Sequence, residues 1–332
     1  VGVLIINFYN FDLNILKDLN SNELNTILVC VFLTFYLNIF NSIFKTGITF
    51  WGRLDIGSYL EIFFDFFTKF LVIIFGLIFN ELLFAFFALL TVNLLKIIIF
   101  YFFFLNYNKC LTLFSFNLVS KKKILKLFKL STPYYFESAT NIIKHSFQII
   151  ILGIFFNAQI VGLVSTLKTL FYFLPIRAWG IVSKVTFYEF TKLYAEKKFK
   201  LLKKIYIKFL KLGLIFLITF LFLSFLFGEY VYTLWLNNSF DLDYYLLTLI
   251  ILDVIFFISA GSIAFVNKAI NKFFPISLFQ MIINLIIIII SYLFFSLQQT
   301  YYFLFLFNLV GSILIFIYSV YFSRKFYKKR LI

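Results

Sequence analysis

The residues of this chain that are best suited to chemistry lie inside long apolar segments. Glu137, Asn141, Lys144 and Gln148 follow one another at spacings of four, three and four residues, which predicts one face of a helix. Ionisable side chains inside a membrane are costly and usually face a bundle interior or a water-filled cavity. The four residues therefore predict a polar lining within an apolar helix.

Other apolar segments carry similar polar positions. Lys168 and Asp253 lie near the middle of their predicted spans, where a long side chain reaches the membrane surface least easily. Polar residues on several spans indicate one shared hydrated cavity rather than isolated defects. The remaining candidate positions are Asn38, Asn41, Asp65 and Arg177.

Structural explanations remain open for many of these residues. Asp65 with Lys69, and Glu137 with Lys144, can be intrahelical pairs. His145 is the only histidine and suits a proton relay, but ordinary polar packing explains it equally well. Asparagines can hold helices together by hydrogen bonding. Residues near predicted cytoplasmic ends can simply extend to the interface, and these are Arg177, Lys45, Glu61 and Lys96.

The composition indicates which elements position these residues. Hydrophobic residues make up 63% of the chain and charged residues 13%, compared with about 25% charged in soluble domains. A water-soluble core cannot absorb so much apolar surface, whereas a bilayer can. The net charge of +16 comes from short basic loops, which fit anionic lipid headgroups better than nucleic acid. We therefore expect an all-α integral membrane protein that contacts membrane lipids and no nucleic acid.

Nine apolar segments predict nine membrane-spanning helices. Lys and Arg crowd alternate gaps, such as 106–132 and 184–211, whereas the gap at 228–243 carries acids and no base. Because cytoplasmic loops are enriched in Lys and Arg, this alternation predicts the sidedness of every gap and a cytoplasmic C-terminus. The spans are expected at 25–44, 61–79, 82–105, 133–156, 159–183, 207–227, 244–266, 274–296 and 301–323.

Motifs for catalysis or cofactor binding are not found in the sequence. It contains no HExxH, Walker phosphate loop or GxSxG, and Cys30 and Cys110 lie in different environments. No predicted loop exceeds about 30 residues, which leaves little room for an extramembrane enzyme domain. We therefore expect a protein that is not an enzyme and that uses no cofactor or metal.

Three stretches resemble a known family of exporters. They are GITFWGRLDIG (47–57), STPYYFESATNIIKHSFQIIILG (131–153) with the basic segment that follows the next span, and GEYVYTLWLNN (228–238). Together they resemble polysaccharide (O-antigen) flippases of the multidrug/oligosaccharidyl-lipid/polysaccharide exporter superfamily. A proline typical of the family near Tyr188 is absent. Against a twelve-span exporter the first three spans are missing, so we expect an N-terminally truncated chain. The apolar start at Val1, without an initiator Met, agrees with that expectation.

The resemblance implies two helical lobes and alternating access. Residues 1–108 would form the end of the first lobe, 109–132 a basic cytoplasmic loop, and 133–332 a second lobe of six helices. The implied substrate is a polyprenyl-diphosphate-linked oligosaccharide, and the implied location is the bacterial cytoplasmic (inner) membrane. Glycan assembly machinery would be a further partner.

The implied roles follow the chemistry of that substrate. Cations would meet the diphosphate, amides would line the glycan path, and carboxylates would couple an ion or proton. The cations are Lys144, Lys168 and Arg177. The amides are Asn38, Asn41, Asn141 and Gln148. The carboxylates are Glu137, Asp253 and Asp65. Three alternatives remain: a multidrug or metabolite exporter of the same superfamily, an integral-membrane glycan polymerase, and a nonfunctional flippase remnant.

Overall fold

The structure is a computed structural model that describes residues 21–50, 53–79, 82–107, 120–236, 242–297 and 300–330. Every regular element in this part of the chain is a helix, which confirms the predicted all-α class. Within the described residues, eight helices are long and apolar enough to cross a membrane. The remaining predicted span, the fourth at 133–156, is also helical, but it carries more polar residues and is divided by a π-helical turn. Cys110 lies outside the described residues.

The chain divides into two compact units, Val1–Leu118 and Val119–Ile332. In the first, α2 (Ser21–Phe50), α3 (Leu54–Phe79) and α4 (Leu82–Tyr107) contain the first three predicted spans. Their core is a small cluster of buried apolar residues, made of Ile48, Phe64, Val92 and Phe100. This unit is therefore a three-helix bundle with a thin core.

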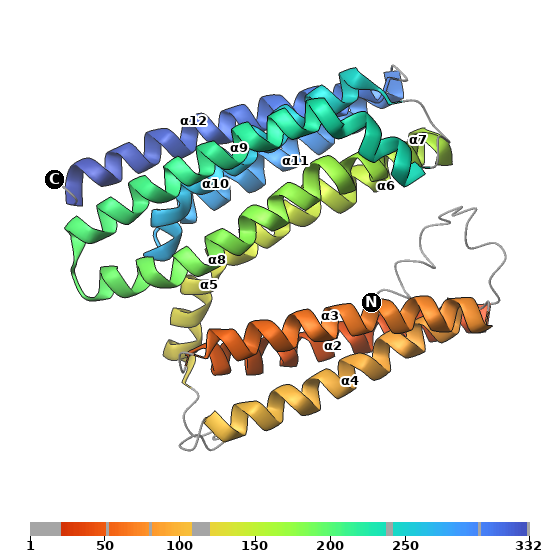
Figure 1. Ribbon diagram of the computed structural model, residues 1–332, viewed down its shortest axis with the longest axis horizontal. Helices are drawn as coiled ribbons and strands as arrows, with labels where there is room; N and C mark the ends of the chain where they lie inside the picture. The colour runs from red at the N-terminus through yellow and green to blue at the C-terminus, as the bar shows by residue number, and fades with distance from the viewer. Residues whose placement is uncertain are drawn as a thin grey trace. The chain divides into compact units, whose positions relative to one another are not determined.

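The second unit contains the other six predicted spans, and five of them are among the eight long apolar helices. Figure 1 labels its helices α5 to α12. Two of the six spans are long helices with a π-helical turn in the middle, at η3 and η4. The other four are uninterrupted α-helices. In chain order the elements are α5 (Lys121–Ile142), η3 (Ile143–Phe147), α6 (Gln148–Phe155), α7 (Ala158–Lys168), η4 (Thr169–Phe173), α8 (Leu174–Ala195), α9 (Phe199–Leu236), α10 (Tyr244–Ala269), α11 (Phe274–Leu297) and α12 (Tyr302–Arg330).

The predicted inter-lobe loop at 109–132 differs in part from the structure. Residues 121–132 are the first turns of α5, and the unit boundary falls after Leu118. Ser120 begins the helix, because its hydroxyl accepts a hydrogen bond from the Lys123 backbone N–H at 3.3 Å. The five lysines that predicted a loop thus lie on a helix whose side chains at 121–130 are all exposed. Residues 109–119 lie outside the described part of the chain.

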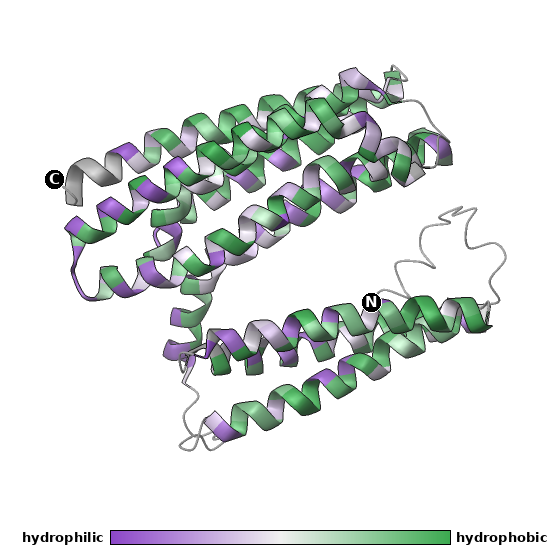
Figure 2. Cartoon of the chain, viewed as in Figure 1, coloured by the Kyte–Doolittle hydropathy of each residue, from purple (hydrophilic) through white to green (hydrophobic). Residues whose placement is uncertain are grey.

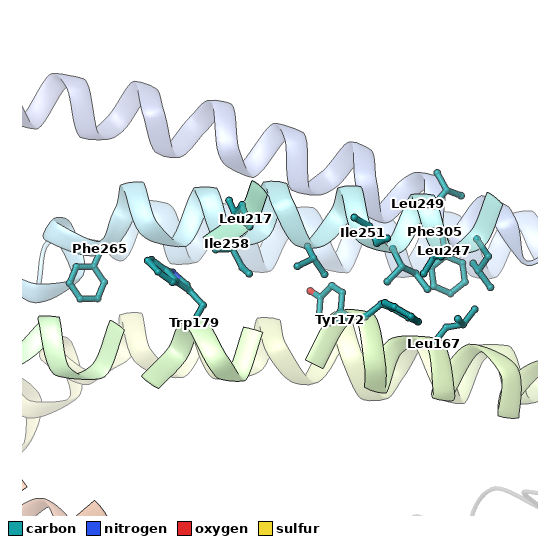
Figure 3. Packing of buried hydrophobic residues seen from close by; sticks show 14 of the residues in the cluster. Leu167, Tyr172, Trp179, Leu217, Leu247, Leu249, Ile251, Ile258, Phe265 and Phe305 are labelled. Atoms are coloured by element: carbon teal, nitrogen blue, oxygen red, sulfur yellow. The ribbon is translucent and has the colours of Figure 1, made fainter. Parts of the chain in front are cut away.

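Helix α10 lies at the centre of the second unit and packs against α8, α9 and α12. Figure 3 shows Leu167, Tyr172 and Trp179 from the α7–α8 span facing Ile251 and Ile258 of α10. These side chains belong to one continuous buried cluster. The core of the second unit is therefore arranged around α10, the helix that also carries Asp253.

The outer surface of the spans is apolar, as a bilayer requires. On α9, Leu214, Ile215, Ile218 and Phe222 each expose about three-fifths of their surface. Hydrophilic residues gather instead at the start of α5 and where α8 meets α9 (Figure 2). There, Lys198 donates to Glu196 at 2.8 Å and lowers the pKa of that carboxyl. This distribution identifies a multi-pass membrane protein.

Candidate functional site

A buried ion pair joins two helices of the second unit. The Lys144 ammonium on η3 donates to Asp253 Oδ1 on α10 at 2.8 Å and to Ser312 Oγ on α12 at 2.7 Å. Ser312 in turn donates to the same Asp253 oxygen. Lys144 and Asp253 are only 2% and 6% exposed. Three spans are thus tied together by one charged cluster.

A second buried chain of hydrogen bonds lies beside the first. Lys168, at the end of α7, donates to Gln148 Oε1 at 2.7 Å, and Gln148 Nε2 donates to Asn308 Oδ1 on α12 at 2.6 Å. Lys168 also donates to the backbone carbonyl of Lys144 at 3.4 Å, which connects the two chains. Unlike Lys144, Lys168 has neutral acceptors in each of these contacts. We call the six side chains the polar network: Lys144, Gln148, Lys168, Asp253, Asn308 and Ser312.

Both lysines of the polar network lie at π-helical turns. Lys144 is part of η3, and Lys168 directly precedes η4. A π-turn accommodates one extra residue in a helix and is frequent at functional sites. Lys144 within η3 and Gln148 directly after it are both buried. The local backbone therefore sets which polar side chains point inward.

The polar face predicted for this helix is only partly correct. Lys144 and Gln148 are buried together, but Asn141 is exposed, and Thr140 takes the buried position instead. Glu137 is half-buried and accepts a 2.6 Å hydrogen bond from Lys268 on α10, so it does not pair with Lys144. The intrahelical alternative for Glu137 is therefore wrong.

Two further candidates in the second unit lie outside the polar network. Arg177 on α8 is exposed. His145 packs edge-on against the rings of Tyr172 and Phe173, at centroid distances of 5.0 and 4.9 Å. Its Nδ1 atom has no hydrogen-bond partner among the described residues. The surroundings of His145 are those of a packed aromatic side chain.

The first unit has ion pairs of a different kind. Asp65 accepts a 3.1 Å hydrogen bond from Lys96 on α4 rather than pairing with Lys69 along its own helix. A second pair joins Lys45 on α2 to Glu61 on α3. Both pairs connect neighbouring helices and are partly exposed.

The two candidate asparagines of α2 differ in their environment. Asn38 is exposed. Asn41 is 5% exposed, and neither polar atom of its side chain has a partner among the described residues. The structure therefore brings together Lys144, Lys168, Gln148 and Asp253. Within the second unit it leaves Glu137, Asn141 and Arg177 apart from them.

Sequence reasoning missed two partners of the candidate residues. Ser312 is an ordinary serine in an apolar span, and Lys268 lies just beyond the predicted span 244–266. A signal for Ser312 was present, because Asn308 precedes it by four residues and places both on one helix face. Nothing local to Lys268 marked its pairing across helices.

Among the described residues, no three His, Cys, Asp or Glu side chains come together as a metal site. The chain matches no known protein family, no curated protein and no solved structure. The polar network itself therefore carries the functional argument.

Proposed function

We propose that this chain is a membrane exporter that moves polyprenyl-diphosphate-linked oligosaccharide across the bacterial cytoplasmic membrane by alternating access. The observation that carries the proposal is the polar network inside the six-span unit. Three charged and three neutral polar side chains are buried where apolar residues would be cheaper, and such groups in membrane proteins mark transport pathways and coupling sites. The family resemblance of the sequence supplies the substrate class.

In this proposal the polar network responds to substrate binding rather than holding the glycan itself. Lys144 already neutralises Asp253, and the whole cluster is buried, so a bulky headgroup would bind elsewhere. Exposed cations and amides suit direct contact with a diphosphate and sugars. Arg177 and Asn141, both exposed in the second unit, are the candidates for that contact. During export, the helices that the network joins would then separate and come together again.

The alternation of basic gaps supports the proposed orientation. It gives a cytoplasmic C-terminus and cytoplasmic ends for α8 and α10. Glycan assembly enzymes on both sides of the membrane would be the functional partners, because the substrate is made on one side and used on the other.

A drug exporter of the same superfamily is less well supported. A cationic drug favours a cavity with free carboxylates, and the only buried carboxylate among the described residues is Asp253, which Lys144 occupies. A glycan polymerase would need a larger outside loop than the predicted 16 residues at 228–243, of which 228–236 belong to α9. A nonfunctional flippase remnant would export no lipid-linked glycan, so the export measurement below distinguishes it from an exporter.

The proposal is tested by export of lipid-linked glycan in cells that depend on this chain. Lys144→Met and Lys168→Met should trap single lipid-linked repeats inside, because each variant removes a cation of the polar network. Loss of a polymerase would instead leave single repeats outside. Lys192→Met, an exposed lysine of α8, is the matched control and should export normally. Normal export by both network variants at normal abundance would refute the proposal.

A further inference from the structure

Four groups from three other elements surround the Lys144 ammonium. Asp253 and Ser312 contact it through oxygen at 2.8 and 2.7 Å. The nitrogen also lies over two aromatic rings, 4.7 Å from the centroid of Phe257 and 5.5 Å from that of Tyr172. The contacts come from α10, α12 and η4, whereas the lysine stem comes from η3. The surroundings of the ammonium are therefore built independently of the helix that supplies it.

This set of contacts selects an ammonium group over a metal ion. A carboxylate and a hydroxyl accept N–H donors, and the face of an aromatic ring attracts a cation. Ser312 donates its own proton to Asp253, so its lone pairs are directed to the lysine. Hard metal ions take six or more oxygen ligands, and among the described side chains two, Asp253 and Ser312, accept hydrogen bonds from Lys144 Nζ.

We propose that Asp253, Ser312, Phe257 and Tyr172 form a binding site for a primary ammonium group, and that Lys144 fills this site from within the chain. The filled site is a latch that ties η3 to α10 and α12. It takes the place of a dissociable coupling cation in the six-span unit. The role as a latch in export rests on the proposed function, whereas the ammonium site does not.

The other interhelical pair of this unit provides a matched control. Lys268 donates to Glu137 at 2.6 Å and also lies over two rings, those of Tyr134 and Phe273, at 6.0 and 5.9 Å. Its chemistry resembles that of Lys144, but both partners of the pair are about one-third exposed. Water can replace the Lys268 ammonium, so truncation there leaves no enclosed ammonium site.

The test is chemical rescue of the full chain, purified in detergent. Lys144→Ala removes the three carbons and the nitrogen of n-propylammonium. This variant should melt several degrees below the wild type, and n-propylammonium chloride should raise its Tm by more than it raises that of the wild type or of Lys268→Ala. Sodium chloride at equal ionic strength and n-propanol should not do so. Equal rescue by sodium chloride or by n-propanol, or no rescue, would overturn the proposed site.

If Lys144→Ala does not fold, the proposed site is tested with a second pair of variants. Asp253 carries an unpaired buried charge in Lys144→Met, so Lys144→Met/Asp253→Asn should be more stable than Lys144→Met alone. Equal or lower stability of the double variant would show that Asp253 does not hold the ammonium. Rescue of Tm in Lys144→Ala, together with no glycan export by the wild-type chain, would refute the proposed function and leave the ammonium site intact. If n-propylammonium fails to raise the Tm of Lys144→Ala but export of glycan still depends on Lys168, the ammonium site is refuted and the proposed function stands.

Discussion

The three-helix unit and the six-span unit hold their charged residues in different ways. In the first, Lys96 pairs with an Asp65 side chain that is 60% exposed. In the second, Lys144 and Asp253 pair where almost no surface is exposed. Both pairs join neighbouring helices, so the difference lies in burial and in the number of partners. Ser312 completes the buried pair, and Gln148 and Lys168 connect to it through the Lys144 backbone.

This difference separates structural pairs from a site that responds to charge. An exposed pair is weakened by solvent and contributes little to stability. Removal of one partner of a buried pair strongly destabilises the fold, because the remaining buried charge has no opposite charge beside it. The second unit should therefore be sensitive to single charge changes to which the first is tolerant.

The largest effect is expected for Asp253→Ala. The substitution leaves the Lys144 ammonium buried with only hydroxyl and aromatic neighbours, and should cost about 3–5 kcal/mol of unfolding free energy. Unfolding by denaturant in mixed micelles measures the loss. Lys268→Ala in the same unit is the comparison and should cost far less. A similar cost for the two variants would remove the distinction between buried and open pairs.

Asn308→Ala should break the hydrogen-bond chain that runs from Lys168 through Gln148 to Asn308. Gln148 Nε2 would lose its 2.6 Å acceptor inside the bundle, which should cost about 1–3 kcal/mol. Stability is measured as for Asp253→Ala, and Asn141→Ala on the exposed side of the same span as Gln148 is the control. Equal stability of Asn308→Ala and the wild type would show that the Gln148 contact is dispensable.

Tight helix contacts allow a test of both units with the same substitution. A Cβ at Gly311 would lie 2.2 Å from Ile287 Cδ1, and one at Gly47 would lie 2.3 Å from Phe104 Cε2. Either Gly→Ala change should overpack its own bundle and cost about 1–3 kcal/mol. Gly153→Ala, with nothing within 4 Å of the new carbon, should be neutral or slightly stabilising. Differential scanning calorimetry of the three variants distinguishes crowding from the general effect of adding a methyl group.

The smallest effect is expected for Lys96→Met. Its partner Asp65 is largely exposed and can be solvated without the lysine, so the loss should stay below about 1 kcal/mol. A double-mutant cycle with Asp65→Asn measures the pair directly. A coupling energy as large as that of Lys144 with Asp253 would erase the contrast between the units.

The sequence predicted the spans well, because a run of apolar residues is a local property. The structure confirms the helical class, and α2 to α4 contain their predicted spans. The polar face of the fourth span was less predictable. Regular helical spacing placed Asn141 with Lys144 and Gln148, but the buried line runs through Thr140 instead.

Pairing was the least predictable property of the candidate site. Spacings of four or seven residues along one helix suggested Asp65 with Lys69 and Glu137 with Lys144. The structure pairs each carboxylate with a lysine of another helix. Tertiary packing decides which charges meet, and no local pattern encodes it. Lys168 and Asp253, by contrast, are predictable as candidates because depth in the membrane can be read from the sequence.

The extra residue held in η3 allows the helix a discrete twist. An α-helix advances about 100° per residue, so conversion of η3 to regular α-helix would rotate α6 by about that angle relative to α5. Gln148 at the start of α6 would then turn away from Lys168. Thiol labelling of single cysteines at Phe147 and Ile150, both exposed here, would detect such a rotation. The polar network would then have two arrangements, one with η3 as a π-helical turn and one with η3 as regular α-helix.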